Sequence, residues 1–282
     1  VAPESNTNPW GYKFSWNPRN VILAGQGAAA QYIENGRYKY LPYNRLFAEA
    51  RTIHVNGWGD FDAYANRDSL SYRAVYGLEK IPTMLRGTLR MPGYCKAWNA
   101  LVRLGLTDDT YKVKDAGSMT YAQFTEAFLP EGKGNLAERL AVFLGEQTDS
   151  EIVGKVTWTG LLSDEKIPFA EASPAQILQE LLERKWKLEA QDKDMIVMQH
   201  RFEYTLGGKS HHLLSSLVVK GEDQTYTAMA KTVGLPAAIA VKMILEDKIK
   251  LRGVQVPVMK EIYEPVLKEL EGFGVRFEER EG

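Results

Sequence analysis

The chain carries Met195-Ile196-Val197-Met198-Gln199-His200-Arg201-Phe202-Glu203-Tyr204-Thr205-Leu206, and Gly207-Gly208 follows it. Every second residue from Ile196 to Leu206 is apolar or aromatic, apart from His200. A period of two predicts a strand. The two glycines supply the left-handed backbone that a tight hairpin turn needs. We therefore predict a β-hairpin from Met195 to Val219, with His200 as a satisfied core histidine on its apolar face.

The residues before this hairpin divide into a mixed part and a helical part. Asn17-Pro18 is a helix-start signal, an N-cap followed by proline, and predicts a helix that runs to about Glu34. Short helices are also expected at Ser69–Tyr76 and from Pro92 to Gly105. The expected strands are Arg37–Leu41, Thr52–Val55, Phe61–Tyr64 and Thr83–Met91.

From about Thr107 to Gln191 the pattern is almost wholly helical, with a second cap-plus-proline start at Ser173-Pro174. The tail from Tyr226 predicts two helices and a short strand at Val275–Glu278. These patterns indicate an α+β fold: a mixed β-sheet with helices packed on it and an all-helical insert. We expect an α+β domain over residues 1–106 and 192–225, a helical insert over 107–191, and a C-terminal segment over 226–282.

The composition excludes several classes of protein. Of the 282 residues, 35 are Lys or Arg and 36 are Asp or Glu, so no charge excess points to nucleic acid or a membrane surface. The apolar stretches are shorter than the roughly 20 residues that span a bilayer. No signal-peptide pattern opens the chain, and a cytoplasmic location is expected. Because the chain begins with Val1 and a Pro/Asn-rich segment, we expect it to start inside a longer protein.

Several candidate motifs favour structural roles. Gly25-Gln26-Gly27-Ala28-Ala29-Ala30 matches the glycine pattern of dinucleotide-binding folds, but it follows a helix-start signal where that pattern needs a strand. We expect small residues inside a helix there. The single cysteine, Cys95, excludes an intrachain disulfide and is expected to be a buried thiol. His211-His212 would point to opposite faces of a strand, and no metal site is expected. Ser69 is expected to be a helix cap.

Two arginine-bearing segments are the strongest candidates for a binding site. They are Tyr64-Ala65-Asn66-Arg67-Asp68-Ser69 and Arg86-Gly87-Thr88-Leu89-Arg90. As a strand, the second segment places Arg86, Thr88 and Arg90 on one face. Arginine presents paired donors in a plane that fits a carboxylate, and it stays charged. The pattern leaves open whether this face is a small-anion site or the solvated side of a sheet.

The sequence resembles the saccharopine dehydrogenases that release glutamate, also called saccharopine reductases. Asn66-Arg67-Asp68-Ser69 and Leu85-Arg86-Gly87-Thr88-Leu89-Arg90 match two motifs of this family, and the matches run in order from residue 8 to the tail. Two further matches complete the set: Asn8-Pro9-Trp10-Gly11-Tyr12-Lys13-Phe14-Ser15-Trp16, and Ala228-Met229-Ala230-Lys231-Thr232-Val233-Gly234-Leu235-Pro236 with Ala240-Val241-Lys242-Met243. The chain departs from the family pattern at Ala65, where proline is usual, and at Trp10, where leucine is usual.

The resemblance implies an activity, a cofactor and contact residues. The family oxidises saccharopine with NADP or NAD and releases glutamate and 2-aminoadipate 6-semialdehyde, a reaction of lysine metabolism. By motif position Arg67, Thr88, Leu89 and Arg90 would contact this tricarboxylate substrate, and Trp16 would lie near the coenzyme. A Rossmann coenzyme domain would precede Val1, and the C-terminal tail would return to it. We assign no catalytic acid or base to this chain. A homodimer through the central sheet is expected, with no nucleic-acid or membrane partner.

Two alternatives stay open. Relatives with this architecture reduce other imines, as carboxynorspermidine dehydrogenase does, although two arginines suit carboxylates better than a polyamine. The chain would otherwise be a non-catalytic binding or dimerisation module.

Overall fold

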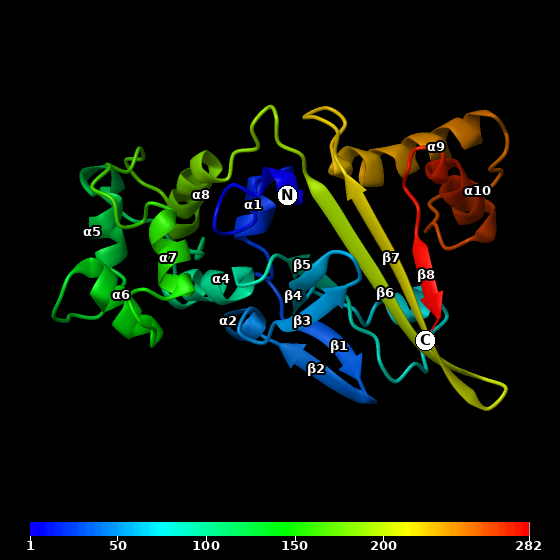
Figure 1. The fold of residues 1–282 in the computed structure, drawn as a ribbon, viewed down its shortest axis with the longest axis horizontal. Helices are drawn as coiled ribbons and strands as arrows, with labels where there is room; N and C mark the ends of the chain where they lie inside the picture. The colour runs from blue at the N-terminus through cyan, green and yellow to red at the C-terminus, as the bar shows by residue number, and fades with distance from the viewer. Residues whose placement is uncertain (282) are drawn as a thin grey trace.

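A computed structural model describes residues 1–281 of the protein (Figure 1). The α+β class expected from the sequence is confirmed. The helices are α1 (Pro18–Ile22), α2 (Tyr43–Leu46), α3 (Tyr72–Val75), α4 (Tyr94–Arg103), α5 (Tyr121–Glu126), α6 (Leu136–Leu144), α7 (Glu151–Trp158), α8 (Pro174–Lys185), α9 (Leu235–Leu245) and α10 (Lys260–Glu271). The 3-10 helices are η1 (Pro3–Ser5) and η2 (Ala116–Ser118), and η3 (Ala230–Gly234) is a π-helix. The strands are β1 (Ala30–Glu34), β2 (Arg37–Leu41), β3 (Arg51–Val55), β4 (Gly59–Ala65), β5 (Gly87–Arg90), β6 (Met195–Leu206), β7 (Lys209–Lys220) and β8 (Glu278–Glu281).

The strands form three antiparallel sheets rather than the one mixed sheet that we expected. Their orders are β1-β2, β3-β4-β5 and β6-β7-β8. Two isolated bridges, Gln31 with Asp68 and Ile33 with Met84, connect β1 with the segments on either side of α3. In Figure 1 the helices α5–α8 lie at one end of the molecule, the first two sheets in the middle, and the third sheet with α9 and α10 at the other end.

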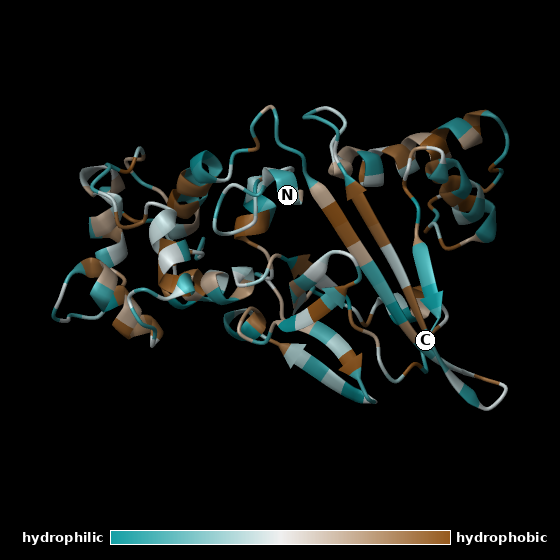
Figure 2. Cartoon of the chain, viewed as in Figure 1, coloured by the Kyte–Doolittle hydropathy of each residue, from teal (hydrophilic) through white to brown (hydrophobic). Residues whose placement is uncertain are grey.

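The predicted hairpin is confirmed as β6 and β7. Their register pairs Leu206 with Lys209, and the two turn glycines have positive φ values of 58° and 80°. Figure 2 shows hydrophobic residues along both strands at the end next to α9. The core position predicted for His200 is wrong: its side chain is exposed and lies 5.9 Å from the Phe202 ring and 5.7 Å from the Phe277 ring, centroid to centroid.

The helix predicted from Asn17-Pro18 is shorter than expected. Its start is correct, since the Asn17 side chain accepts a hydrogen bond from Arg19 N. It ends at Ile22 because the chain turns at Gly25 and Gly27, where φ is 85° and 91°. A Cβ at Gly25 would lie 2.2 Å from a methyl carbon of Leu46. The glycine motif is therefore a turn between α1 and β1, not part of a helix, and its order is the reverse of the strand-then-helix order of a dinucleotide site.

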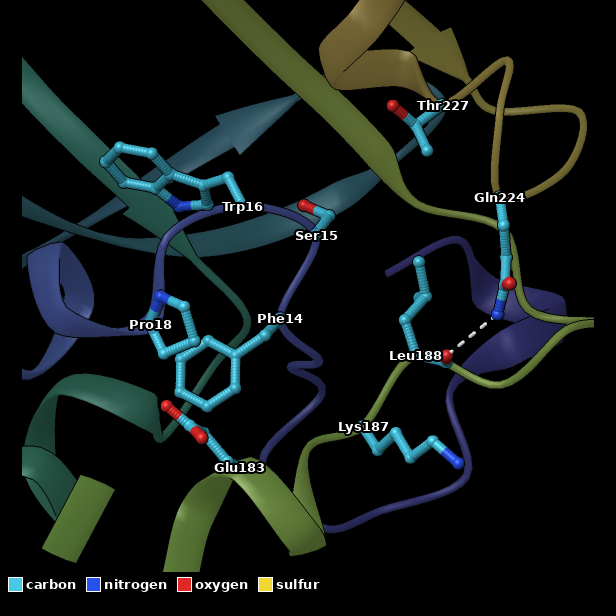
Figure 3. A pocket seen from close by; sticks show the side chains of 9 residues that line it. All are labelled: Phe14, Ser15, Trp16, Pro18, Glu183, Lys187, Leu188, Gln224 and Thr227. Atoms are coloured by element: carbon cyan, nitrogen blue, oxygen red, sulfur yellow. Dashed lines mark hydrogen bonds between the residues drawn. The ribbon is translucent and has the colours of Figure 1, made fainter. Parts of the chain in front are cut away.

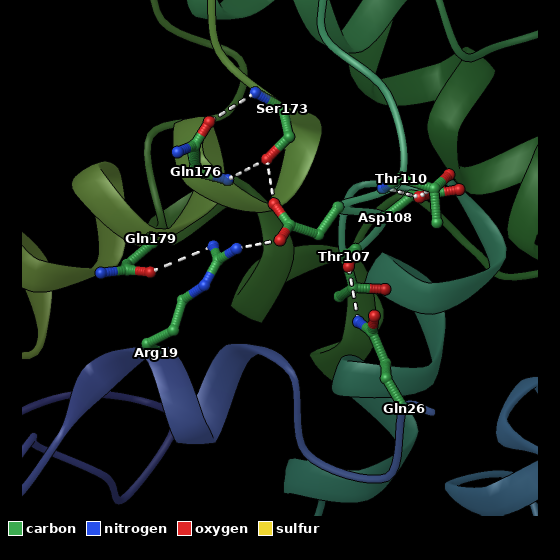
Figure 4. Close-up of polar contacts among 9 residues, drawn as sticks. Arg19, Gln26, Thr107, Asp108, Thr110, Ser173, Gln176 and Gln179 are labelled. Carbon is green, nitrogen blue, oxygen red and sulfur yellow. Dashed lines mark hydrogen bonds and ion pairs between the residues drawn. The ribbon is translucent and has the colours of Figure 1, made fainter. Parts of the chain in front are cut away.

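The helical character of residues 107–191 is confirmed by α5 to α8. Ser173 caps α8 in a capping box with Gln176, as the cap-plus-proline signal predicts. Two polar contacts join this block to the N-terminal part of the chain (Figure 4). Arg19 forms an ion pair with Asp109, and Gln26 Nε2 donates to the carbonyl of Thr107 at 2.6 Å.

Buried side chains form two hydrophobic clusters among the described residues. The first runs from Trp10 to Trp186 and joins the N-terminal part to the helical block. The second joins Leu217 and Val219 of β7 to α9 and α10. The tail also adds β8 to the free edge of β7. The division into domains given above stays a prediction. No helix among the described residues is both long and apolar enough to cross a membrane.

Candidate functional site

The two arginine-bearing segments lie side by side at β4 and β5. The predicted strand Thr83–Met91 is confirmed only over Gly87–Arg90, which pairs with β4. Asn66 N donates to the carbonyl of Arg86 at 2.8 Å, and Arg86 N donates to Ser69 Oγ at 2.9 Å. Ser69 is therefore a buried link between the segments and not the expected helix cap. No side chain within residues 1–281 caps α3; Asp68 instead holds the turn ahead of it, since its Oδ1 accepts from Leu70 N at 2.7 Å and from Ser71 N at 3.2 Å.

Arg90 lies among three tyrosine rings. Its Cζ is 5.1 Å from the ring centroid of Tyr12, 5.5 Å from that of Tyr94 and 5.9 Å from that of Tyr64. We call Tyr12, Tyr64 and Tyr94 the tyrosine cage. The strand register places Tyr64 opposite Thr88, and Tyr64 itself is buried in the first hydrophobic cluster. The face that carries Thr88 and Arg90 is therefore not a solvated sheet surface.

Arg90 makes no ion pair within residues 1–281. The register of β4 and β5 places Asp62 opposite it, but Asp62 Oδ2 accepts a hydrogen bond from Cys95 N at 2.9 Å. Arg90 Nη1 donates to the carbonyl of Leu89 at 3.0 Å, and its buried Nε has no hydrogen-bond partner. Burial raises the pKa of the Tyr12 hydroxyl, although Arg90 acts in the opposite direction, so the hydroxyl stays protonated at neutral pH. A partly buried cation without an ion pair is costly. This arrangement suits a carboxylate ligand, whose two oxygens match the guanidinium fork.

Arg86 makes a second aromatic contact, with a single ring. Its Cζ lies 4.1 Å from the ring centroid of Tyr72 on α3, and its Nη1 donates to the carbonyl of Asp68 at 3.5 Å. Both arginines of the β5 segment thus rest on aromatic rings, which favour a cation above their faces.

Arg67 sits in a strained turn just after β4. Its φ is 45°, in the left-handed region that is uncommon for residues other than glycine. Its carbonyl accepts from Gln31 N at 2.7 Å, and Ser69 N donates to the carbonyl of Gln31 at 2.8 Å. The Arg67 side chain is exposed and makes no ion pair within residues 1–281. Ala65 pairs with Gly87 in the sheet, so the β4 ladder holds the backbone ahead of Arg67 where the family usually has proline.

An open groove of about 650 Å³ lies beside this region (Figure 3). Its lining comes from three segments that are far apart in sequence. Phe14, Ser15, Trp16 and Pro18 come from the N-terminal segment, Glu183, Lys187 and Leu188 from the end of α8 and the residues after it, and Gln224 and Thr227 from the loop after β7. The Trp16 ring is 45% exposed. Phe14, which also lines the groove, packs edge-on against Tyr12 with ring centroids 5.8 Å apart. This contact connects the groove with the tyrosine cage.

The remaining candidate residues lie outside this site or are inaccessible. The Cys95 thiol is buried as expected, and burial with the nearby Asp62 carboxylate raises its pKa. No group of three metal-ligating side chains occurs within the described part of the chain. The site thus brings together Thr88, Leu89 and Arg90, and Tyr12 and Phe14 connect them to the groove that Trp16 also lines. Pattern reasoning overlooked the tyrosine cage. One of its members could have been found from the sequence: if the strands that contain Tyr64 and Thr88 are neighbours, these two residues can lie opposite each other.

Comparison with known proteins gives one family. The profile described as "Saccharopine dehydrogenase C-terminal domain" matches residues 1–275. The chain is 37% identical to the mitochondrial alpha-aminoadipic semialdehyde synthase of Rattus norvegicus, over 98% of the chain and 30% of that protein. It is 32% identical to the saccharopine dehydrogenase [NADP(+), L-glutamate-forming] of Saccharomyces cerevisiae, over 99% of the chain and 64% of that protein.

A solved structure agrees with these matches. The apo histidine-tagged saccharopine dehydrogenase (L-Glu forming) from Saccharomyces cerevisiae superposes with a TM-score of 0.87 at 31% identity, over 100% of this chain and 64% of that chain. The chain thus spans less than two thirds of the length of these relatives. It belongs to the saccharopine dehydrogenase C-terminal domain family.

Proposed function

We propose that this chain is the substrate-binding part of an NADP-dependent saccharopine dehydrogenase. The full-length protein would oxidise the secondary amine of saccharopine to an imine, whose hydrolysis gives glutamate and 2-aminoadipate 6-semialdehyde, in lysine metabolism. The observation that carries this proposal is the partly buried guanidinium of Arg90, which lies among three tyrosine rings and makes no ion pair within residues 1–281. A substrate with three carboxylates would supply an ion-pair partner.

Each proposed contact residue has a distinct role. Arg90 would bind one carboxylate of the substrate from within the tyrosine cage, and Thr88 and Leu89 would shape the strand edge beside it. Arg67, exposed on its turn, would reach a second carboxylate. NADP would accept the hydride, and Trp16, with an exposed ring on the groove, would contact it. These residues bind and orient the substrate, and no proton transfer is assigned to them.

The Arg67 contact is tested in the full-length protein. Replacing Arg67 with alanine is expected to raise the KM for saccharopine by about 10- to 100-fold, since a hydrogen bond to a charged group contributes about 1.5–3 kcal/mol. Steady-state kinetics of NADP+ reduction measures this change. Arg37→Ala, which removes an exposed arginine of β2, is the matched control and should leave KM unchanged. An unchanged KM in Arg67→Ala would refute the carboxylate contact.

The two alternatives predict different kinetics. Carboxynorspermidine would need carboxylates facing its ammonium groups, whereas two of the proposed contact residues, Arg67 and Arg90, are cations. Competition between saccharopine and carboxynorspermidine in the same assay separates the two substrates. A non-catalytic module would give no turnover with either compound, even as the full-length protein.

A homodimer is also proposed. The single central sheet through which it was expected to form is divided into three, and the third sheet, β6-β7-β8, is proposed in its place. Phe202, Tyr204 and Leu206 are 50%, 40% and 65% exposed along one face of β6, and the outer edge of β6 pairs with no other strand in the described residues. A second copy of the chain would cover this face. Phe202→Glu is expected to convert a dimer to a monomer in sedimentation velocity, because a buried charge opposes association. Tyr38→Glu, at an exposed tyrosine of β2, is the control. A wild-type monomer would contradict this proposal.

A further inference from the structure

We propose that Tyr12 is a positioning residue for Arg90. Its ring would hold the guanidinium fork ready for a substrate carboxylate. This inference rests on the function proposed above, because it assigns a role within the same binding site.

The geometry distinguishes Tyr12 from the other members of the cage. Its ring is the nearest of the three to Arg90 Cζ, at 5.1 Å. Tyr64 and Tyr94 are buried in the first hydrophobic cluster, where their rings also serve the packing of β4 and α4. Tyr12 is only partly buried and lies at the border of that cluster. It is therefore the cage residue best placed to act on Arg90 next to a bound ligand.

Arg90 needs such support because few polar contacts orient it. Its Nη1 bonds to the neighbouring carbonyl of Leu89, and its Nε has no partner. An arginine side chain has many rotamers, and fixing one of them before the ligand arrives lowers the entropic cost of binding. The face of an aromatic ring attracts the guanidinium without occupying the donors that a carboxylate would use.

Tyr12 is itself held in place from both sides. Its carbonyl accepts a hydrogen bond from Asn8 Nδ2 at 2.8 Å. Its ring packs edge-on against Trp186 after α8, with centroids 5.1 Å apart, and against Phe14 at 5.8 Å. Phe14 lines the groove, and Phe14 N donates to the carbonyl of Trp186 at 2.8 Å. The ring that faces Arg90 thus has a fixed position between the groove and the core.

The test compares two substitutions at Tyr12 in the full-length protein. Tyr12→Leu removes the ring and is expected to raise the KM for saccharopine about 5- to 30-fold, the equivalent of a desolvated cation–π contact. Tyr12→Phe keeps the ring and should stay within about threefold of wild type. The KM for NADP+ should not change in either variant, whereas general damage to the fold would alter both constants. Tyr40→Leu, at an exposed tyrosine of β2, is the control.

A binding measurement keeps the test independent of turnover. Isothermal titration of glutarate, a dicarboxylate, into the same variants should show a similar weakening for Tyr12→Leu alone. If Tyr12→Leu does not fold, Tyr12→Met fills a similar volume without a ring and replaces it. Unchanged KM and Kd in the ringless variant, equal losses in Tyr12→Phe and Tyr12→Leu, or no binding of glutarate by the wild type would each overturn the role of Tyr12. Glutarate binding that depends on the Tyr12 ring, without turnover of saccharopine, would support the role and refute the proposed reaction.

Discussion

Replacing Trp10 with alanine is expected to lower the free energy of unfolding by about 3–5 kcal/mol, the usual cost of removing a large buried aromatic side chain. Trp10 is fully buried, and its Nε1 donates to the carbonyl of Lys155 at 2.9 Å. Its ring packs edge-on against three others at centroid distances of 5.5 Å for Tyr94, 6.3 Å for Trp98 and 5.2 Å for Trp186. Alanine would leave a cavity at the point where the N-terminal segment, α4 and the end of α8 meet.

Urea denaturation followed by circular dichroism measures this loss. Trp10→Phe should be milder, because it keeps an aromatic ring and loses mainly the hydrogen bond to Lys155. Trp16→Ala is the matched control: it removes a tryptophan from the same segment, but this ring is 45% exposed. If Trp10→Ala and Trp16→Ala lowered the unfolding free energy equally, the central packing role of Trp10 would be wrong.

The elements that the sequence predicts best are those with local signals. The hairpin follows from a period of two and two adjacent glycines, and Ser173-Pro174 marks the start of α8. The predicted end of the helix that starts at Pro18 was wrong for a physical reason. The cap at Asn17 marks only where a helix begins, and the alanines that follow Gly27 suit a helix or a strand. Pairing with β2 decides for the strand, and no local pattern carries that information.

The binding site was predictable in part for the same reason. Alternation along one short strand suffices to group Thr88 with Arg90. The tyrosine cage is not predictable in this way, because Tyr12 and Tyr94 reach Arg90 only through tertiary packing of distant segments. Ser69 illustrates the same limit: a serine before a helix suggests a cap, but its hydroxyl accepts instead from Arg86 N, just before β5.

Replacing Asp192 with alanine is expected to destabilise the protein by about 3–5 kcal/mol, because it leaves a buried cation without its partner. Lys13 Nζ and Asp192 Oδ2 are 2.6 Å apart, and their side chains are only 7% and 4% exposed. The same oxygen accepts from Glu189 N at 2.7 Å. This pair joins the N-terminal segment to the residues that lead into β6. Chemical denaturation at pH 7 measures the change.

The double variant Lys13→Met with Asp192→Leu removes both buried charges. It therefore separates the loss of the ion pair from the cost of leaving one buried charge unpaired. Removing both charges together is expected to restore most of the lost stability, since apolar side chains of similar volume often replace a buried ion pair without loss. Lys220→Met, which breaks the more exposed ion pair with Glu4, is the control and should cost at most about 1 kcal/mol. A double variant as unstable as Asp192→Ala would show that the two side chains do not act as a pair.

The same pair predicts a specific dependence of stability on pH. Burial acts to raise the pKa of Asp192, but the hydrogen bonds from Lys13 and Glu189 N outweigh it, and the pKa is lowered in the folded state. A carboxyl with a lowered folded-state pKa stabilises the fold above its unfolded-state pKa of about 3.9, and this contribution is lost as the pH falls through the folded-state value. The stability difference between wild type and Asp192→Asn should therefore be full at pH 7 and shrink below about pH 4. An equal difference at pH 7 and at pH 2.5 would mean that the charge of Asp192 does not contribute to stability.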